Sequence, residues 1–538
     1  MPMTADAPAS LVSLQQLYDS SSDPRVLSLL AALQEAAGSD GWMALKDIGF
    51  YDFGLDSRQI ETGTVFVALK SQTQQDDNKS FGYLQQAAQT AAFILTETLP
   101  TGAFANEADA LQALDTLPCP VLYVPSIRTG LGSLIQAHLQ AKHAVTLPRV
   151  VAVTGTNGKT TVSQLIAQLM ALSGSSSTVM GTAGNGRLGA LTQASHTTGD
   201  ARAVQQFLYN MGEEGADILA LEASSHGLDQ SRLQGVPVQV AVYTNLSRDH
   251  LDYHSDMDDY ARAKAKLFDR SHFPTLTHAI INSDDDYSSV MQAQAQAGDV
   301  TVWTYSLTDS GADFYIESMT PSLDGVQLRI YSPFGVLRVH SPLLGKFNVA
   351  NLVAALAAAA ALGADIDALS DQLEKLKGAT GRMQRVASKD GCFIVDYAHT
   401  PDALTQVLAS LKTHCEGKLW AVFGCGGDRD TGKRPLMAQA GLSGADCVIL
   451  TADNPRSEDP QAILADMQVG MSEAQYQRTH IEPDRAHAIE YAIRHAGTDD
   501  IVVIAGKGHE TYQEICGVRH DFDDSQVVMQ ALKRFERV

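Results

Sequence analysis

The chain contains 538 residues, of which 44% are hydrophobic, and it carries a formal net charge of −23. This length predicts about three domains of roughly 100–200 residues each. The acidic excess argues against binding to nucleic acid, which depends on lysine and arginine contacts to phosphate, and against docking on an anionic membrane surface.

The first 126 residues are predicted to alternate short strands with helices. Strands are expected at Thr64–Leu69, Ala92–Thr96 and Val121–Val124, and Thr101–Asp115 is expected to be a surface insertion. A helix predicted over Arg128–His143 then leads into the most informative part of the chain.

That part combines a strand, a glycine-broken loop and the start of a helix. An apolar, β-branched run (150–154) is followed by Gly155–Gly158, and Lys159 and Thr160 open the predicted helix. The loop N–H groups and the positive helix end would face an anion, the lysine would serve the β- and γ-phosphates, and the threonine hydroxyl would serve Mg²⁺. The strict phosphate-loop pattern has glycine where this chain has Val153, so the strand–loop–helix context carries the prediction of a nucleotide site.

Seven further apolar runs end in polar and often glycine-rich clusters. Strands that alternate with helices predict parallel sheets, whose ligands bind in the crevice outside the carboxyl ends of the strands. We therefore expect sites along two facing sheet edges, one in the middle of the chain and one near its end. The runs are Ile218–Leu221, Val238–Tyr243, Ala279–Ile281, Cys392–Val395, Leu419–Phe423, Cys447–Leu450 and Ile501–Ala505.

The predicted fold class is α/β with three domains. A smaller N-terminal α/β domain is expected over residues 1–126, and a central P-loop-type domain with a parallel sheet over 127–380. A Rossmann-like C-terminal domain is expected over 381–538.

Three side chains near these strand ends have different expected roles when each is considered by itself. Glu222 ends a buried strand and is placed like a metal-binding carboxylate, although a helix cap is the alternative. His250 lies near another strand end, where a histidine is more often structural. Lys264 falls on a predicted helix, Asp259–Phe268, where a lysine usually faces solvent.

The six cysteines are scattered and form no CxxC pair, which favours neither a zinc site nor a disulfide framework. Reduced thiols are typical of the cytosol. We see no signal peptide, and the longest apolar run, Leu352–Leu362, is far shorter than the roughly 20 residues that span a bilayer. We expect a cytoplasmic monomer.

Several motifs taken together resemble the Mur ligases, the ATP-dependent amide ligases of peptidoglycan synthesis. The resemblance extends from about Leu55 to the end of the chain. It implies that the N-terminal domain binds a UDP-sugar, the central domain binds ATP, and the C-terminal domain binds an amino acid. The motifs are Thr-Gly-Thr-Asn-Gly-Lys-Thr-Thr (154–161), Glu222–Leu228, Asn245–Asp252, Gly345–Asn351, Gly381–Met383, Asp396–Pro401 and Gly506–Glu510.

The resemblance also implies roles for residues at the nucleotide. Thr160 and Glu222 would hold one Mg²⁺, and His250 would hold a second together with Lys264. This lysine matches the family's carbamylated lysine, with Lys266 as a possible rival. Lys159, Glu222, His250 and Lys264 would be catalytic. The ATP-binding set would be Gly155, Thr156, Asn157, Gly158, Lys159, Thr160, Thr161, Asn282, Arg382, Asp396 and His399.

The implied reaction begins with attack of the γ-carboxylate of D-Glu, in UDP-MurNAc-L-Ala-D-Glu, on the γ-phosphate of ATP. An amine then attacks the acyl phosphate. The sequence departs from the family pattern at two places that concern substrate binding. His196 stands where relatives often have asparagine, and residues 71–78 replace a stretch that usually contains Asp-Gly. The residues implied to bind this substrate are Leu55, Ser57, Arg58, Thr197, Thr198, Ser224, Gln230 and Arg232.

The choice of amino acid is implied by Asp453-Asn454-Pro455-Arg456. Meso-diaminopimelate ends in an amine and a carboxylate, and Arg456 can clamp a carboxylate with two hydrogen bonds, with help from Arg429. Gly506 and Glu510 would hold the distal amine end. A turn is the alternative for 453–456, and a surface salt-bridge cluster for Asp428–Asp430.

Four other functions are less consistent with these residues. An L-lysine-adding ligase of the same family is disfavoured by Arg456, and a folylpolyglutamate-type ligase by the N-terminal nucleotide-sugar domain. A P-loop ATPase switch leaves Lys264 without a role, and a catalytically dead binding protein would not need the intact catalytic set.

Overall fold

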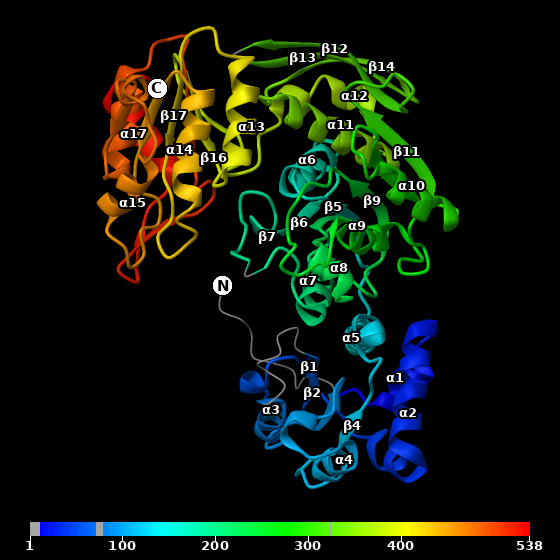
Figure 1. Cartoon of the computed structure of the whole chain (residues 1–538). Helices are drawn as coiled ribbons and strands as arrows, with labels where there is room; N and C mark the ends of the chain where they lie inside the picture. The colour runs from blue at the N-terminus through cyan, green and yellow to red at the C-terminus, as the bar shows by residue number, and fades with distance from the viewer. Residues whose placement is uncertain (1–10, 71–78, 195, 323) are drawn as a thin grey trace.

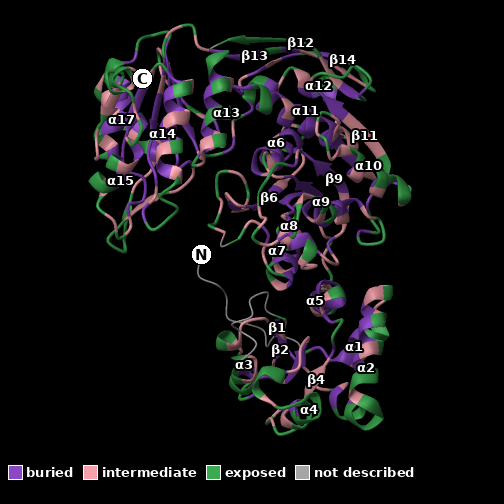
Figure 2. Ribbon diagram, in the orientation of Figure 1, coloured by how far each residue is buried: buried purple, intermediate pink, exposed green. Residues whose placement is uncertain are grey.

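The structure is a computed structural model that describes residues 11–70, 79–194, 196–322 and 324–538. Three α/β units follow one another along the chain, from the blue N-terminal unit through the central unit to the orange and red C-terminal unit in Figure 1. Each unit has its own sheet, and in Figure 2 the strands in the middle of the sheets are mostly buried.

The N-terminal unit is built on a four-stranded parallel sheet with the order β1-β2-β3-β4. Ser13 begins the first helix with a capping box, in which its hydroxyl and the Gln16 side chain satisfy each other's backbone N–H groups. The elements are β1 (Asp52–Gly54), β2 (Thr64–Ala68), β3 (Phe93–Thr96), β4 (Val121–Tyr123), α1 (Leu14–Ser20), α2 (Pro24–Leu45), η1 (Ser57–Gln59), α3 (Ser80–Ala87), η3 (Thr101–Ala103), α4 (Glu107–Leu114) and α5 (Arg128–Lys142).

The predicted surface insertion at 101–115 is wrong in part. Most of it forms helix α4, whose Ala110 and Leu114 are buried. Leu114 packs with Phe66 and Ile94 of the sheet. The apolar residues of this short helix recur at helical spacing, which places them on one face.

The central unit contains a ten-stranded sheet with the order β14-β13-β12-β11-β10-β9-β5-β8-β6-β7. Its middle strands are parallel, and the hairpin strands at both edges run antiparallel. The strands are β5 (Arg149–Thr154), β6 (Ser177–Gly181), β7 (Gly184–Gly186), β8 (Ile218–Glu222), β9 (Val238–Tyr243), β10 (His278–Asn282), β11 (Thr301–Ser306), β12 (Phe314–Ser322), β13 (Gly325–Ser332) and β14 (Gly335–Ser341).

Helices cover both faces of this sheet (Figure 1). They are α6 (Lys159–Leu172), α7 (Ala201–Glu213), α8 (Ser225–Asp229), α9 (Met257–Ala265), η4 (Lys266–Phe268), α10 (Ser288–Ala297), α11 (Lys346–Ala361), α12 (Ile366–Ser370) and η5 (Leu373–Lys375).

The C-terminal unit has a six-stranded sheet with the order β15-β16-β20-β17-β18-β19, in which only the edge strand β15 is antiparallel. Its elements are β15 (Gln384–Val386), β16 (Cys392–Asp396), α13 (Pro401–Lys412), β17 (Leu419–Phe423), α14 (Lys433–Gly444), β18 (Cys447–Leu450), α15 (Pro460–Met467), α16 (Glu473–Tyr476), β19 (Thr479–Ile481), α17 (Arg485–His495), β20 (Ile501–Ala505), β21 (Tyr512–Ile515), β22 (Val518–Asp521) and α18 (Asp524–Arg534).

Two joints connect the units. Between the first and second, the backbone N–H of Ser133 on α5 donates to Gln234 Oε1 at 2.8 Å, and Gln234 Nε2 donates to Ser133 Oγ at 2.8 Å. Gly132 allows this approach, because a Cβ there would overlap the carbonyl oxygen of Gln234. Between the second and third, His414 Nδ1 lies 2.8 Å from the carbonyl oxygen of Ser322, and the N–H of Gly345 donates to His414 Nε2 at 3.0 Å.

The two predicted domain boundaries fall between the sheets. Helix α5, however, lies just after the first boundary and still packs against the N-terminal unit. Leu131, Leu134 and Leu139 of this helix join the N-terminal core, although residues 127–380 were assigned to the central domain. The domain limits therefore stay a prediction. No helix in the described ranges is both long and apolar enough to cross a membrane.

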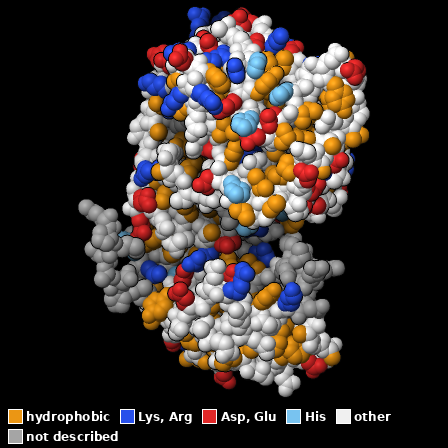
Figure 3. Space-filling model, turned by 90° about the vertical axis from the view of Figure 1, so that its left-hand side faces the viewer, with side chains coloured by type: hydrophobic (Ala, Val, Ile, Leu, Met, Phe, Trp, Pro, Cys, Tyr) orange, Lys and Arg blue, Asp and Glu red, His pale blue; other side chains and the backbone are white. Residues whose placement is uncertain are grey.

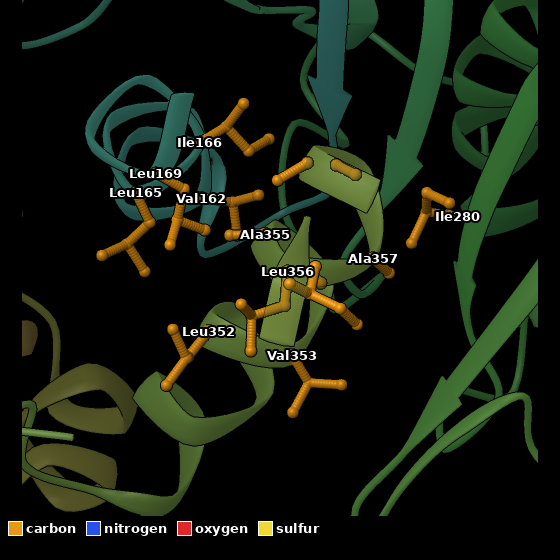
Figure 4. Packing of buried hydrophobic residues seen from close by; sticks show 14 of the residues in the cluster. Val162, Leu165, Ile166, Leu169, Ile280, Leu352, Val353, Ala355, Leu356 and Ala357 are labelled. Atoms are coloured by element: carbon orange, nitrogen blue, oxygen red, sulfur yellow. The ribbon is translucent and has the colours of Figure 1, made fainter. Parts of the chain in front are cut away.

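The phosphate-loop helix α6 is held by the alanine-rich helix α11. Val162, Leu165 and Leu169 of α6 lie against Leu352 and Leu356 of α11 in the close view of Figure 4, and all five are fully buried. Small alanine side chains let the two helices approach closely, and this packing fixes the axis of α6 behind the loop.

Replacing Leu356 with alanine is expected to lower the free energy of unfolding by about 2–5 kcal/mol, because the side chain is fully buried and leaves a cavity. Urea denaturation followed by circular dichroism would measure the change. The matched control is Leu111→Ala on α4, where the side chain is 45% exposed. A loss at Leu356 no larger than at Leu111 would contradict the packing argument.

Candidate active site

The loop between β5 and α6 has a backbone that only glycine allows at two positions. Gly155 and Gly158 have φ values of 150° and 87°, and a Cβ on Gly155 would overlap the hydroxyl of Thr244. Val153, where the strict pattern has glycine, is a fully buried residue of β5. The cradle therefore begins two residues later than the strict pattern suggests.

Lys159 bends back over this loop. Its amine donates to the carbonyl oxygens of Gly155 at 3.0 Å and Thr156 at 2.9 Å. Desolvation lowers the pKa of the amine, while the nearby Glu222 opposes that shift and Arg382 adds to it. The influence of Arg382 indicates that the C-terminal unit brings a positive charge toward the loop.

Glu222 lies at the carboxyl end of β8 and is 2% exposed. Its Oε1 accepts from the hydroxyl of Thr160 at 2.9 Å and from the N–H of Thr182 at 2.8 Å, and its Oε2 accepts from the Thr182 hydroxyl at 3.1 Å. Burial raises the pKa of Glu222, and Lys159 and these hydrogen bonds oppose the rise. A carboxylate beside a hydroxyl next to a phosphate loop is a donor set that suits Mg²⁺.

Lys264 lies on α9 and is 1% exposed, which contradicts the solvated position that its sequence alone suggested. Its amine donates to the carbonyl oxygen of Gly155 at 2.9 Å and lies 4.4 Å from the centre of the Tyr260 ring. Desolvation, followed by repulsion from Lys159, lowers its pKa well below the ordinary value. The rival Lys266 is more exposed than Lys264, and its amine forms an ion pair with Asp229 at 2.7 Å.

His250 has a left-handed backbone with φ of 53° and a half-exposed ring. The ring centre lies 5.0 Å from that of His226 and 5.9 Å from that of Tyr260, so the His250 ring and the Lys264 amine both lie near the ring of Tyr260. Within the described ranges, no three His, Cys, Asp or Glu side chains gather as metal ligands. A metal at this position would therefore need other ligands, such as a hydroxyl or a modified lysine.

The other residues predicted at the nucleotide come from two units. Asn282 ends β10 and donates to the carbonyl oxygen of Thr244 at 2.7 Å. In the C-terminal unit, the guanidinium of Arg382 lies 4.6 Å from the centre of the Tyr397 ring, and buried Asp396 accepts from the N–H of Met383 at 2.7 Å. His399 is exposed next to them.

The residues predicted to bind the second substrate separate into two groups. Thr198, Ser224, Gln230 and Arg232 form one network, in which Arg232 donates to Gln230 Oε1 and to the carbonyl oxygen of Thr198 at 3.0 Å. Thr198 Oγ1 accepts from the N–H of Ser224 at 3.0 Å, and the hydroxyl oxygens of Thr197 and Thr182 lie 2.9 Å apart. Thr182 links this network to Glu222, and no sequence motif identified Thr182 as a site residue.

The second group lies on the N-terminal unit. Ser57 contacts Gln86 at 3.1 Å, Leu55 is half-buried, and Arg58 pairs with Asp56 at the surface. None of the three has a described contact to the first group. The departure noted at 71–78 lies outside the described residues.

A cluster of polar side chains lies at the carboxyl ends of β18 and β20. Asn454 Nδ2 donates to Glu510 Oε2 at 2.9 Å, and buried Lys507 donates to that same oxygen at 3.1 Å and to Asn454 Oδ1 at 3.2 Å. Gly506 has φ of 118°, and a Cβ there would lie 2.6 Å from Asp453 Oδ2. Lys507 belongs to a quoted motif, but its role was missed because its partner Asn454 is 53 residues away in sequence.

Arg456 follows Pro455 after β18 with φ of 50°, and its guanidinium donates to the carbonyl oxygen of Gly427 at 2.6 Å. It forms no ion pair with any described residue, so its charge is available to a ligand. Arg429 is exposed nearby. The alternative salt-bridge cluster at Asp428–Asp430 is wrong, because Asp428 is bonded to Ser457 instead and no described ion pair involves these three residues.

The face of the molecule in Figure 3 mixes acidic and basic side chains over its surface.

The fold and the loop define a three-unit α/β protein of the P-loop class. The Mur ligase middle domain matches residues 153–359, and the Mur ligase glutamate ligase domain matches residues 381–508. The chain belongs to the Mur ligase family, which confirms the resemblance and the α/β fold class inferred from the sequence.

Individual relatives agree with this assignment. A UDP-N-acetylmuramoyl-L-alanyl-D-glutamate–2,6-diaminopimelate ligase of Chromobacterium violaceum is 41% identical over 487 residues, covering 89% of this chain and 93% of its own length. The ligase of that name from Pseudomonas aeruginosa is 41% identical over 494 residues, covering 92% and 97%. A solved structure of such a ligase has a TM-score of 0.72 and 45% identity, covering 98% of this chain and 100% of its own.

Proposed function

We propose that this protein is an ATP-dependent ligase that joins meso-diaminopimelate to the D-Glu γ-carboxylate of UDP-MurNAc-L-Ala-D-Glu in peptidoglycan precursor synthesis. The observation that carries the proposal is Arg456, whose guanidinium donates to a backbone carbonyl and forms no ion pair with a described residue. The chain is 41% identical to a ligase named for diaminopimelate. We expect the enzyme to act as a cytoplasmic monomer on these small molecules.

ATP would bind on Gly155–Thr161, with the Lys159 amine at the γ-phosphate. Asn282 would contact the adenine, and Arg382, Asp396 and His399 would close over the nucleotide from the C-terminal unit. The hydrogen bond between Thr160 and Glu222 supports one Mg²⁺ site at these two residues. When bound, Mg²⁺ would neutralise charge on the transferring phosphoryl group.

The D-Glu γ-carboxylate would attack the γ-phosphorus to form an acyl phosphate and release ADP. The neutral amine of the amino acid would then attack the acyl carbon, and inorganic phosphate would leave. Closure of the C-terminal unit would exclude water that otherwise hydrolyses the intermediate. The network of Thr197, Thr198, Ser224, Gln230 and Arg232 would orient the peptide part, and Leu55 and Ser57 the uridine end.

Lys264 is the residue whose environment best suits carbamylation. Its lowered pKa favours a neutral amine, which can add to CO₂ and lose a proton to give an anionic carbamate. Such an anion could share a second Mg²⁺ with His250. Lys266 is a poor rival, because its amine is already engaged in an ion pair with Asp229.

The amino-acid pocket supports diaminopimelate over L-lysine. Arg456, with Arg429 beside it, would bind the distal carboxylate, while Asp453, Asn454, Gly506 and Glu510 would hold the amine end. L-lysine has no distal carboxylate and would leave the guanidinium unpaired, which typically costs a factor of about 10⁴–10⁵ in specificity at a dedicated polar site.

Phosphate release tests the proposed function directly. The enzyme is given ATP, Mg²⁺ and UDP-MurNAc-L-Ala-D-Glu with meso-diaminopimelate, with L-lysine or with no amino acid. We expect turnover with diaminopimelate only. Equal rates in all three mixtures would reject the ligase function, and faster turnover with lysine would reject only the choice of amino acid.

Replacing Arg456 with alanine is expected to raise the KM for meso-diaminopimelate by about 100-fold, since a charge-assisted bidentate pair contributes about 1.5–3 kcal/mol. The KM for ATP should stay within twofold, because the nucleotide is expected on another sheet. Steady-state kinetics would separate the two constants. Arg429→Ala, at the exposed neighbour, should give a smaller effect, and an unchanged KM in Arg456→Ala would contradict the clamp.

A further inference from the structure

A buried ion pair lies directly behind the amino-acid pocket. Arg485 begins α17 and Asp524 begins α18, and both side chains have 0% exposure. Arg485 Nε donates to Asp524 Oδ1 at 2.8 Å and Nη2 donates to Oδ2 at 2.7 Å, so the pair is bidentate. The motifs of the sequence did not single out either residue.

The same guanidinium also holds the ends of two strands. Nη2 donates to the carbonyl oxygen of Ala505 at 3.0 Å, and Nη1 donates to that of Ala452 at 3.4 Å. These residues immediately precede Gly506 and Asp453, which begin the two segments of the pocket. Because β20 and β18 lie on opposite sides of β17, one side chain sets the spacing across three strands.

The charge of Arg485 also reaches the pocket. A Cβ placed on Gly506 would lie 2.6 Å from Asp453 Oδ2 and 4.0 Å from Arg485 Nη2, so carboxylate and guanidinium flank the same glycine. Desolvation alone would lower the pKa of Arg485, but Asp524, and then Asp453 and Glu510, outweigh it and raise that pKa. The cation is therefore coupled to both carboxylates of the pocket as well as to its direct partner.

We propose that Arg485 is a positioning residue for the incoming amino acid, which holds Asp453 and Gly506 at a fixed separation and is itself oriented by Asp524. The proposal rests on the proposed function of the pocket. Arg485 contacts carbonyl oxygens and Asp524 and does not need to touch the substrate. Its loss should therefore weaken amino-acid binding while leaving the nucleotide site intact.

Replacing both partners separates positioning from stability. Removing one partner leaves an unpaired buried charge and destabilises the fold, whereas an apolar pair of similar volume is often tolerated. The variants are Arg485→Met, Asp524→Leu and the double variant. We expect the thermal midpoint of the double variant to lie closer to that of the wild type than that of either single variant does.

In the double variant the KM for meso-diaminopimelate should rise by about tenfold or more, since small misplacements of binding groups reduce binding and rate strongly. The KM values for ATP and for the UDP-linked substrate should stay within twofold. The matched control is Arg537→Met with Asp390→Leu. Arg537 pairs with Asp390 at 2.5 Å and bonds the carbonyl oxygens of Ile493 and Ala496, away from the pocket.

A double variant with a KM for diaminopimelate within twofold of the wild type, or with all three KM values raised in parallel, overturns the proposal. If the double variant does not fold, Arg485→Lys provides the test, because it keeps the charge but not the fork of donors. It should also raise the KM for diaminopimelate, and an unchanged value overturns the proposal. Wild-type enzyme without diaminopimelate-dependent turnover would instead reject the proposed function.

Discussion

Replacing Lys264 with alanine is expected to reduce the rate of amide formation by about 10²–10³-fold, the usual effect of removing one group that stabilises charge in a transition state. Lys264 is 1% exposed, and its amine donates to the carbonyl oxygen of Gly155 and forms no ion pair with a described carboxylate. Desolvation lowers its pKa, so a larger fraction is neutral and able to add CO₂. Phosphate release under saturating substrates would measure the loss.

Lys266 supplies the matched control, two residues away. It is paired with Asp229 at 2.7 Å, and Lys266→Ala should keep the rate within twofold. Enzyme equilibrated with ¹³C-bicarbonate should show a carbamate resonance that is absent from Lys264→Ala and retained in Lys266→Ala. Retention of full activity in Lys264→Ala, or an equal loss in both variants, would contradict the assignment.

Replacing Lys159 with methionine is expected to lower kcat by about 10³-fold or more, the scale on which a cation at a transferring phosphoryl group acts. Methionine keeps an unbranched stem but has no charge. In the wild-type protein, the Lys159 amine donates to the carbonyl oxygens of Gly155 and Thr156 in the loop. The variant should fold normally, since the methionine stem can occupy a similar space.

Rapid-quench measurement of acyl-phosphate formation would locate the loss in the first chemical step. Calorimetry with a non-hydrolysable ATP analogue gives the separate effect on binding, which we expect to be smaller. A variant with an unchanged rate of phosphate transfer would rule out the proposed role of Lys159.

The strands were predictable because their composition leaves few alternatives. Val238–Tyr243 and Leu419–Phe423 were predicted with the same limits that the structure gives, since runs that are buried on both faces of a parallel sheet are almost continuously apolar. The phosphate loop was equally visible, because its glycines, lysine and threonine are adjacent in sequence. Helix α4 was missed because only two of its residues are buried.

The candidate site was only partly accessible from the sequence. The sequence around Lys264 is typical of a solvated lysine. Its burial becomes evident only in the structure, where the amine donates to the carbonyl oxygen of Gly155 and lies beside the ring of Tyr260. Thr182, Lys507 and Arg485 were missed because their partners lie elsewhere in the chain: Thr182 meets Glu222 across 40 residues and Arg485 meets Asp524 across 39. Such pairs follow from strand order, which local patterns do not encode.

The close contact between α5 and Gln234 bears on which units of the protein can move relative to each other. With no room for a methyl group at Gly132 and two hydrogen bonds across the seam, the first two units form one mechanical block. The proposed closure of the C-terminal unit would then involve the segment between η5 and β15 and the contact between His414 and Gly345.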